Sequence, residues 1–534
     1  MTHFNTAMMK NLKYHKWLAA LLLMLGATGC NDDLLTTVPN DRLSSDIFWK
    51  TEKDAIFAAN AVYTYLDSTN IFYYDGMSDI GHNNSVTSQE AMIERGQYDP
   101  TFTRIGSEWV FSYAGIRAAN IYLEKVDEVQ TNNPAVVTRL KAEVRVLRAY
   151  LYIKLAALYG DVPLVEKSIS LSESRSISRT PAGQIWDFVY KELTESAAAL
   201  PEVQAEKGRI TKGAALALNA RAMLYAGRYD LAAQESKKVI DLGIYKIYPS
   251  YEKLFTYAGE GNEEVILDKQ YVKNNYSNSV FQLFGPWSQR NSNSAVVPTR
   301  ALIDAYPMAN GKKITDPASG YNAAEPYKNR DPRLGFSIFV KGDKLPDGTI
   351  YNSDPGNGTA DAVDFSWFAT STGYNFQKYI TPEDLPQPTN SGLNIILLRY
   401  ADVLLMYAEA KVELNTIDQS VYDAINQVRQ RADVALPAIT GTLSQGDLRE
   451  VIRNERKLEL AFEGLRYFDI RRWKLSETLV PGRVYGISYL KNGSPAMIEV
   501  PAFEKAFNKN RDYLWPIPQR EIELNNSLSQ NLNW

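Results

Sequence analysis

Apolar residues recur every three or four positions in several long stretches of the chain. Such spacing places side chains on one face of an α-helix. The clearest stretch covers residues 135–159, where Val144, Leu147, Leu151 and Leu155 follow this interval. Similar stretches predict helices over 51–67, 109–129, 180–200, 214–226, 229–242, 399–415 and 420–432. The pattern therefore predicts a mostly α-helical protein.

Some of these helices form pairs that resemble tetratricopeptide repeats. In the stretch 218–240, Ala220 and Ala232 are small enough to let two antiparallel helices approach closely, and Gly227 permits the sharp turn between them. Three pairs are expected, at 135–200, 213–242 and 399–432. Because their spacing is uneven, we expect an interrupted helix-pair scaffold and not a uniform solenoid.

Helical spacing disappears between residues 262 and 393. Pro, Gly, Asn and Asp are frequent there, and short β-like runs such as EEVILDKQY and GFSIFV appear. An insert of this length without regular structure is uncommon in a compact domain unless it is functional. We expect loops with short strands and helices laid over the helical scaffold. The segment 68–106 is rich in Asn, Asp, Gly, Ser and Tyr and also predicts a loop.

The first 29 residues have the pattern of a secretory signal peptide. Lys10, Lys13 and Lys16 form a positive segment, and residues 17–27 are apolar or small. This run is shorter than the about 20 residues that span a bilayer. Small residues precede Cys30, the only cysteine, so the sequence resembles a bacterial lipobox in which that cysteine receives lipid.

Two features near the cysteine leave alternatives open. Ala27 stands where a lipobox usually carries leucine, so simple cleavage near Gly29 with a free thiol is the alternative to lipidation. Residues 31–33 read Asn-Asp-Asp, which resembles the surface-export signal of Bacteroidetes lipoproteins. The alternative for this acidic cluster is a solvated linker.

These patterns divide the chain into consecutive regions. We expect a signal peptide over 1–29, a lipidated tether over 30–50, an N-terminal helical region over 51–242 and a C-terminal region over 243–534. Within the last region, we expect 262–393 to be irregular, 394–474 to be helical and 475–534 to form an extended segment. The predicted fold is mostly α, with a tetratricopeptide-like scaffold and a large loop-rich half containing short strands.

Composition excludes several classes of function. The formal net charge is −4 and becomes more negative when the lysines of the signal peptide are lost, so no basic patch argues for nucleic acid. His82 is the only histidine after the signal peptide, which leaves no Cys/His zinc cluster and makes any Ser-His-Asp site depend on this one residue. A pair of carboxylates, as in glycosidases, is the enzymatic route that stays open.

Several segments in a fixed order together resemble the SusD/RagB family of outer-membrane nutrient-binding lipoproteins. They include FWKTEKDAIFAANAVYTYL, RVLRAYLYIKLAALYGDVPLV, GRITKGAALALNARAMLYAGRYDLAAQESKKVI, LLRYADVLLMYAEA with VIRNERKLELAFEGLRYFDIRRWK, and RDYLWPIPQREIELNNSLSQN. One of these segments alone would be a weak signal. Together they span nearly the whole chain after the signal peptide, which makes the resemblance specific.

The resemblance implies a location and a function. Members of this family sit on the outer membrane and cover a SusC-like TonB-dependent transporter. They capture oligosaccharides and pass them to the transporter, and they are not enzymes. Capture of peptides, a carboxylate glycosidase and a purely structural lid are the alternatives. Some relatives bind calcium, but no Asp/Asn run here matches an EF-hand loop, so no cofactor is predicted.

The resemblance also implies that ligand residues lie in the loop after the first helix and in the irregular half. Sugar rings present flat C–H faces that lie on aromatic rings, and their hydroxyls need polar partners. The candidates from the first region are Tyr73, Tyr74, Asp79, Asn83 and Asn84, and those from the second are Trp287, Arg290 and Trp367.

We favour Tyr73, Tyr74 and Trp287 as stacking residues. Trp287 follows Gly-Pro and has polar neighbours, although it could equally fill a cavity under the loops. For Trp367, a short buried strand is the favoured interpretation, and His82 is interpreted as a surface loop residue.

Charged and aromatic residues of the family segments are interpreted as structural. Glu455, Glu459 and Glu463 are spaced to share one side of a helix. The arginines expected to pair with them are Arg453, Arg456, Arg466, Arg471 and Arg472. Such pairing keeps carboxylates ionised and engaged, so we do not expect a catalytic site there. The run from Trp515 to Pro518 is expected to form a packed extended segment and not a site.

Overall fold

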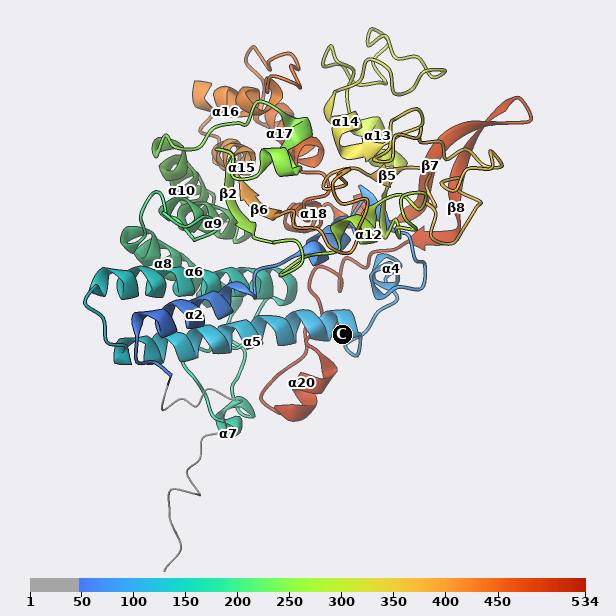
Figure 1. The fold of residues 1–534 in the computed structure, drawn as a ribbon. Coiled ribbons are helices and arrows are strands. Elements are labelled where there is room, and N and C mark those ends of the chain that lie inside the picture. Colours follow the sequence, from blue (N-terminus) through green and yellow to red (C-terminus); the bar gives the residue numbers. More distant parts are fainter. Residues whose placement is uncertain (1–47) are drawn as a thin grey trace, which may run out of the picture.

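The computed structural model describes residues 48–534. The predicted signal peptide, Cys30 and most of the predicted tether therefore lie outside the described residues. The longer helices are α2 (Glu52–Tyr63), α5 (Thr103–Lys125), α6 (Pro134–Tyr159), α8 (Ala182–Ala199), α9 (Lys212–Tyr225), α10 (Tyr229–Asp241), α15 (Tyr400–Glu413), α16 (Gln419–Arg429) and α17 (Gln445–Glu459). They gather on one side of the molecule (Figure 1).

These helices form a continuous packed scaffold. Helix α5 packs on α6, α6 on α8, α8 on α9, and α9 on α10, and α15 continues the series from α10 to α16 and α17. The apolar stripe predicted on α6 is buried as expected, with Val144 and Leu155 fully inaccessible. Helix α2 begins at a capping box between Thr51 and Asp54. The prediction of a mostly helical, paired scaffold is confirmed.

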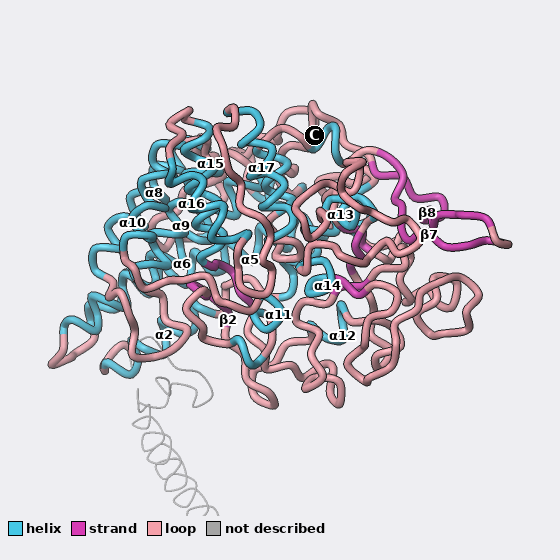
Figure 2. The backbone as a smooth tube through the Cα atoms, turned by 90° about the horizontal axis from the view of Figure 1, so that it is seen from above, coloured by secondary structure: helices cyan, strands magenta, loops and turns pink. Residues whose placement is uncertain are grey.

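The other side of the molecule is irregular, as predicted for 262–393 (Figure 2). The shorter α-helices of residues 48–534 are α3 (Phe72–Gly76), α4 (Gln89–Glu94), α7 (Leu171–Ser174), α11 (Tyr251–Leu254), α12 (Val280–Phe284), α13 (Arg300–Ala305), α14 (Arg333–Ser337), α18 (Arg466–Arg472), α19 (Ser476–Leu479) and α20 (Gln519–Leu524). Antiparallel two-stranded sheets join β1 (Gly81–Asn83) to β3 (Val296–Pro298), β2 (Val265–Lys269) to β6 (Ile395–Arg399), and β4 (Ile338–Phe339) to β5 (Asn375–Phe376).

The interpretation of 68–106 as loop is only partly right. This segment contains α3, β1 and α4, and α4 begins where the Ser88 side chain accepts a hydrogen bond from the Ala91 amide. Strand β1 is too short to show a hydrophobic period, and it forms because β3 pairs with it from more than 200 positions away. Long-range pairing therefore orders a stretch whose composition is typical of a loop.

The predicted extended segment 475–534 contains a β-hairpin. Strands β7 (Gly482–Lys491) and β8 (Ser494–Lys505) pair antiparallel and project from the body of the molecule (Figures 1 and 2). Asn492 and Gly493 have positive φ values of 52° and 78° at the tip. An Asn-Gly pair with this geometry is the strongest short-range hairpin signal. The sequence therefore carried a signal for the hairpin that the prediction of a plain extended segment missed.

The three glutamates of the last family segments are buried in ion pairs, as expected, but their partners differ from those predicted. Glu459 lies 2.8 Å from Arg333, 2.8 Å from Arg399 and 2.6 Å from Arg431. Burial opposes ionisation, yet these guanidinium groups hold the pKa of Glu459 well below its usual range. Glu455 pairs with Arg333 and Arg429, and Glu463 pairs with Arg399 and Lys378.

The predicted arginines of the glutamates' own segment have other partners, because helix geometry turns them elsewhere. Arg456 pairs with Asp402 and Asp469, and Arg472 pairs with Glu409 and Asp469. The partners of the glutamates come from distant segments that the chain folds onto α17. Trp515 is fully buried, as predicted, and its indole N–H donates to the Tyr467 hydroxyl.

Candidate functional site

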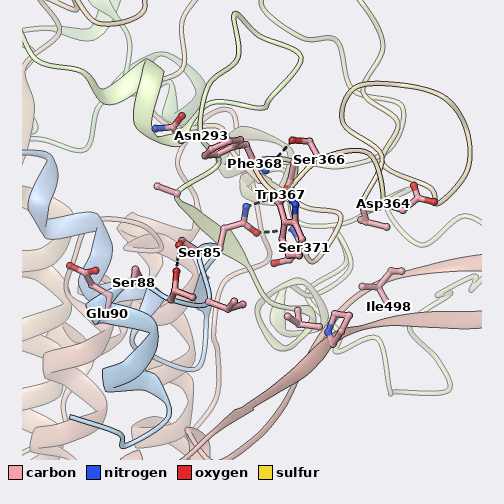
Figure 3. Close-up of a pocket in the computed structure, with 18 of the residues that line it drawn as sticks. Ser85, Ser88, Glu90, Asn293, Asp364, Ser366, Trp367, Phe368, Ser371 and Ile498 are labelled. Carbon is pink, nitrogen blue, oxygen red and sulfur yellow. Dashed lines mark hydrogen bonds between the residues drawn. The ribbon is translucent and has the colours of Figure 1, made fainter. Parts of the chain in front are cut away.

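A cleft of about 1050 Å³ lies between the loop after α3, the irregular half and the β7–β8 hairpin. Figure 3 shows part of its lining. Its walls come from three parts of the chain that are far apart in sequence. The lining residues include Asn70, Tyr73, Asn84–Ser88, Glu90, Arg104, Asn293, Ala295, Pro355, Val363, Asp364, Ser366–Ala369, Ser371, Tyr489 and Ile498–Pro501.

Aromatic side chains project from the loop formed by residues 355–371, which we call the aromatic loop. Trp367 is 93% exposed and Phe368 is 52% exposed. Single exposed apolar residues are ordinary, but two adjacent aromatic rings on a cleft wall are the kind of surface that marks a binding site. The expectation that Trp367 lies in a short buried strand is wrong, because the chain turns there and presents both rings to solvent.

Trp287 packs against Phe368 of the aromatic loop. Its ring stacks on Phe368 with centroids 5.1 Å apart and an interplanar angle of 15°. It is half-buried and does not itself line the cleft. The sequence left open whether Trp287 stacks on a ligand or packs under the loops, and the structure places it under Phe368.

Hydrogen bonds fix the aromatic loop to the rest of the molecule. The Asn84 side chain donates to the Ala369 carbonyl at 2.9 Å and accepts from the Ser371 amide at 2.9 Å. The Ser288 amide donates to the Asp361 carboxylate at 2.9 Å. The Asn84 amide group is thus engaged within the protein, and this residue positions the loop that carries Trp367.

Tyr73, at the start of α3, also lines the cleft. Its ring contacts Phe284 with centroids 5.3 Å apart. Burial raises the pKa of Tyr73 to about 12, with a smaller contribution from the Glu90 charge. The phenol is therefore neutral at physiological pH and can both donate and accept a hydrogen bond. Tyr73, Asn84 and Trp367 are the predicted site residues that the structure brings to one cleft.

Other predicted candidates are held inside the protein. Tyr74 is only 2% exposed and packs against Tyr467, Phe468 and Trp515, so the expectation of a stacking residue there is corrected. Successive residues of a helix point about 100° apart, which turns Tyr74 into the core while Tyr73 faces the cleft.

The polar candidates near β1 also have internal partners. Asp79 accepts two hydrogen bonds from the Arg466 guanidinium at 2.8 and 2.9 Å. The backbone and side-chain amides of Asn83 both donate to Glu94 at 2.8 Å. His82 was expected on the surface, but it is fully buried with its Nδ1 2.9 Å from Glu94. Each side chain uses its polar atoms to hold the cleft wall in place.

Arg290 is exposed but does not line the cleft. Its backbone has a φ of 59°, in the left-handed region. Because Arg290 lies outside the cleft lining, its expected contact with a ligand stays a prediction.

The prediction from sequence missed the contribution of the β7–β8 hairpin to the cleft. Tyr489 from β7 and Ile498, Glu499, Val500 and Pro501 from β8 form the wall nearest the hairpin. The Asn-Gly tip was the available signal for these strands. Nothing local indicates that the hairpin returns to a loop 400 positions earlier in the chain.

Three acidic residues of the cleft are the candidates for a carboxylate-based reaction. Glu90, Asp364 and Glu499 line the cleft. Glu90 lies 3.6 Å from Arg104, Glu499 lies 2.6 Å from Arg483, and Asp364 accepts from the Gly356 amide at 3.0 Å.

Within residues 48–534, no group of three or more His, Cys, Asp or Glu side chains could hold a metal ion. Over the same range, no helix is long and apolar enough to cross a membrane.

Comparison with known families identifies the chain. The model of the SusD family matches residues 263–534, slightly more than half of the chain. The chain belongs to the SusD family. A second model, described as "Starch-binding associating with outer membrane", matches residues 36–224. The family predicted from the sequence segments is therefore confirmed.

Individual relatives in the SusD family cover nearly the whole chain. SusD-like protein P2 of Formosa agariphila is 25% identical over 538 residues, which cover 96% of this chain and 98% of that protein. The starch-binding protein SusD of Bacteroides thetaiotaomicron is 26% identical over 466 residues, which cover 80% and 78%. A solved structure of a SusD-like carbohydrate-binding protein from Bacteroides fragilis has a TM-score of 0.84 at 28% identity and covers 90% of this chain and 100% of that chain.

Proposed function

We propose that this protein binds an oligosaccharide or polysaccharide in the cleft and delivers it to a SusC-like TonB-dependent transporter. The observation that carries the proposal is the exposed pair Trp367 and Phe368 on a cleft wall, with Trp287 stacked behind. Membership of a family that includes a starch-binding protein supports it. The protein would act by binding and not by catalysis.

The chemistry of the cleft suits a sugar. The flat faces of Trp367 and Phe368 can cover the C–H face of a pyranose ring, which removes apolar surface from water. The neutral Tyr73 hydroxyl and the hydroxyls of Ser85 and Ser88 also line the cleft and are partners for sugar hydroxyls. The hydrogen bonds of Asn84 keep the aromatic loop in place before a ligand arrives, which lowers the entropy cost of binding.

Isothermal titration with a panel of polysaccharides and their oligosaccharides tests this function. We expect one glycan to bind with a single site and no reducing sugar to be released on long incubation. Release of reducing sugar would favour a carboxylate glycosidase. Binding of peptides together with silence toward every glycan would favour peptide capture and overturn the proposal.

The proposed location is the outer face of the outer membrane, through lipid on Cys30. A tether beside a transporter would hold the cleft at high effective concentration relative to the transporter entrance. Copurification of the lipidated protein with a SusC-like transporter is the expected result. Recovery of the protein without such a transporter, under conditions that preserve outer-membrane complexes, would argue against the partnership.

A further inference from the structure

The charged groups that line the cleft are unbalanced. Three carboxylates line it, those of Glu90, Asp364 and Glu499, against one guanidinium, that of Arg104. In the view of Figure 3, Glu90 and Asp364 lie on either side of Trp367. A ligand seated on the aromatic loop would therefore meet negative charge at more than one point along the cleft.

Arg104 forms ion pairs with two glutamates, and within residues 48–534 its buried Nε and Nη2 atoms have no hydrogen-bond partner. Its guanidinium lies 3.0 Å from Glu108 and 3.6 Å from Glu90, and its side chain is 13% exposed. The nearby acidic groups raise the pKa of Arg104 although burial opposes its charge. Recognition of a sulfate or carboxylate relies on charge-assisted bonds from an available Arg or Lys. Taking Arg104 for this purpose would leave Glu108, which is buried, with less compensation.

The two exposed carboxylates keep their charge facing water. Asp364 is exposed and accepts from a backbone amide, which does not neutralise it. Glu499 pairs with Arg483, but both side chains are exposed, at 39% and 59%, and Arg483 does not line the cleft. Exposed ion pairs are weak and screened, so Arg483 reduces the repulsion from Glu499 without converting the wall into an anion site.

We propose that the cleft selects glycans that carry no sulfate or uronate groups. This inference rests on the proposed glycan-binding function and adds the chemical class of the ligand. Stacking on Trp367 and Phe368 is indifferent to substituents at the edge of a sugar ring, so the aromatic loop alone does not discriminate. The discrimination comes from the carboxylates, which repel an anionic glycan. It also comes from Arg104, whose ion pairs with Glu90 and Glu108 oppose its binding an anionic group.

Titration with uncharged and acidic polysaccharides tests this proposal. A panel of uncharged polysaccharides (starch, laminarin, galactomannan, xyloglucan) and acidic ones (polygalacturonate, alginate, carrageenan) is titrated against the wild-type protein and Trp367→Ala. We expect the acidic polysaccharides to bind about tenfold or more weakly than the uncharged ones, and the affinity for the uncharged ones to change little between low and high salt. Binding of an acidic polysaccharide as tight as that of the uncharged ones, and lost in Trp367→Ala, would overturn the charge inference and leave the glycan site standing. No binding by any member would instead overturn the proposed function.

A charge-neutral variant isolates the cause. In Asp364→Asn/Glu499→Gln, the shape of the wall is kept and two carboxylates are lost, while Glu90 stays to hold Arg104. The ratio of the Kd of a chemically sulfated ligand to the Kd of its uncharged parent should fall about threefold per carboxylate removed, from the Coulomb energy of a charge pair near 6 Å in water.

The matched control is Glu128→Gln, an exposed carboxylate beyond the end of α5 and outside the cleft. It should leave both ligands unchanged. Equal affinity of wild type for the uncharged and the sulfated ligand would contradict the inference, as would an equal gain in the control.

Discussion

Replacement of Trp367 by alanine is the most direct probe of the cleft. Trp367 is 93% exposed, so its removal creates no cavity and exposes no core. Surface substitutions of this kind usually change the free energy of unfolding by less than about 0.5 kcal/mol. Any loss of ligand binding can therefore be assigned to the missing ring and not to unfolding.

The size of the loss follows from the area of one ring face. A sugar that stacks on the indole removes on the order of 100 Å² of apolar surface from water, which at about 25 cal/mol per Å² is about 2.5 kcal/mol. This corresponds to a roughly 60-fold rise in Kd. Trp367→Phe keeps a smaller flat face and should recover part of that loss.

Isothermal titration with the glycan found for wild type gives Kd, and thermal unfolding gives stability. Phe57→Ala is the control, because Phe57 is a half-exposed aromatic residue on α2 and does not line the cleft. It should bind as wild type does. If Trp367→Ala retains the wild-type Kd, the ring does not stack on the ligand. If the variant loses as much free energy of unfolding as free energy of binding, the lost affinity cannot be assigned to the ring, and the reasoning fails.

Three further predictions address positioning, pH and attachment. Asn84→Ala removes the hydrogen bonds to Ala369 and Ser371, so the aromatic loop should become more mobile. The Kd for the glycan should rise several-fold, with a smaller change in Tm than a core substitution gives. An unchanged Kd would show that other contacts fix the loop. Burial raises the pKa of Asp75 to about 7, from 3.8 in the unfolded chain, so this group's contribution to stability is complete below pH 3.8 and is lost as pH rises to 7. Denaturant unfolding at pH 5 and 8 should therefore show wild type losing about 2.6 kcal/mol relative to Asp75→Asn, and parallel pH profiles would contradict this. Cys30→Ala should be released in soluble form and still bind ligand in titration, and firm membrane retention without the transporter would exclude the lipid tether.

The helical scaffold could be predicted from sequence because its signal is local. The apolar residues on one face of α6 and the small residues of α9 and α10 can be recognised from a few helical turns of sequence. The structure buries them as expected. The hairpin also had a local signal, at Asn492 and Gly493. These elements form where sequence neighbours are also spatial neighbours.

The candidate site could be predicted only as a set of regions. Trp367 is exposed because Asn84, 285 positions before Ala369, ties the aromatic loop in its turn. The direction of Tyr74 depends on how α3 docks on α18, which is fixed where the Gly464 and Arg466 amides donate to Asp75. No local pattern in either segment reports a partner so distant in sequence.

The polar residues that proved to have internal partners explain why the cleft has its shape. Lys505, at the end of β8, is buried and donates to the backbone carbonyls of Gly76, Ser78 and Gly81 while it pairs with Glu94 at 2.8 Å. Burial opposes the charge of Glu94, but Lys505 and His82 hold its pKa below the usual range. One buried cluster thus ties the end of helix α3, which carries Tyr73, to strand β8, which carries Glu499. Because a buried polar group without partners is costly, this cluster opposes a shift of α3 relative to β8.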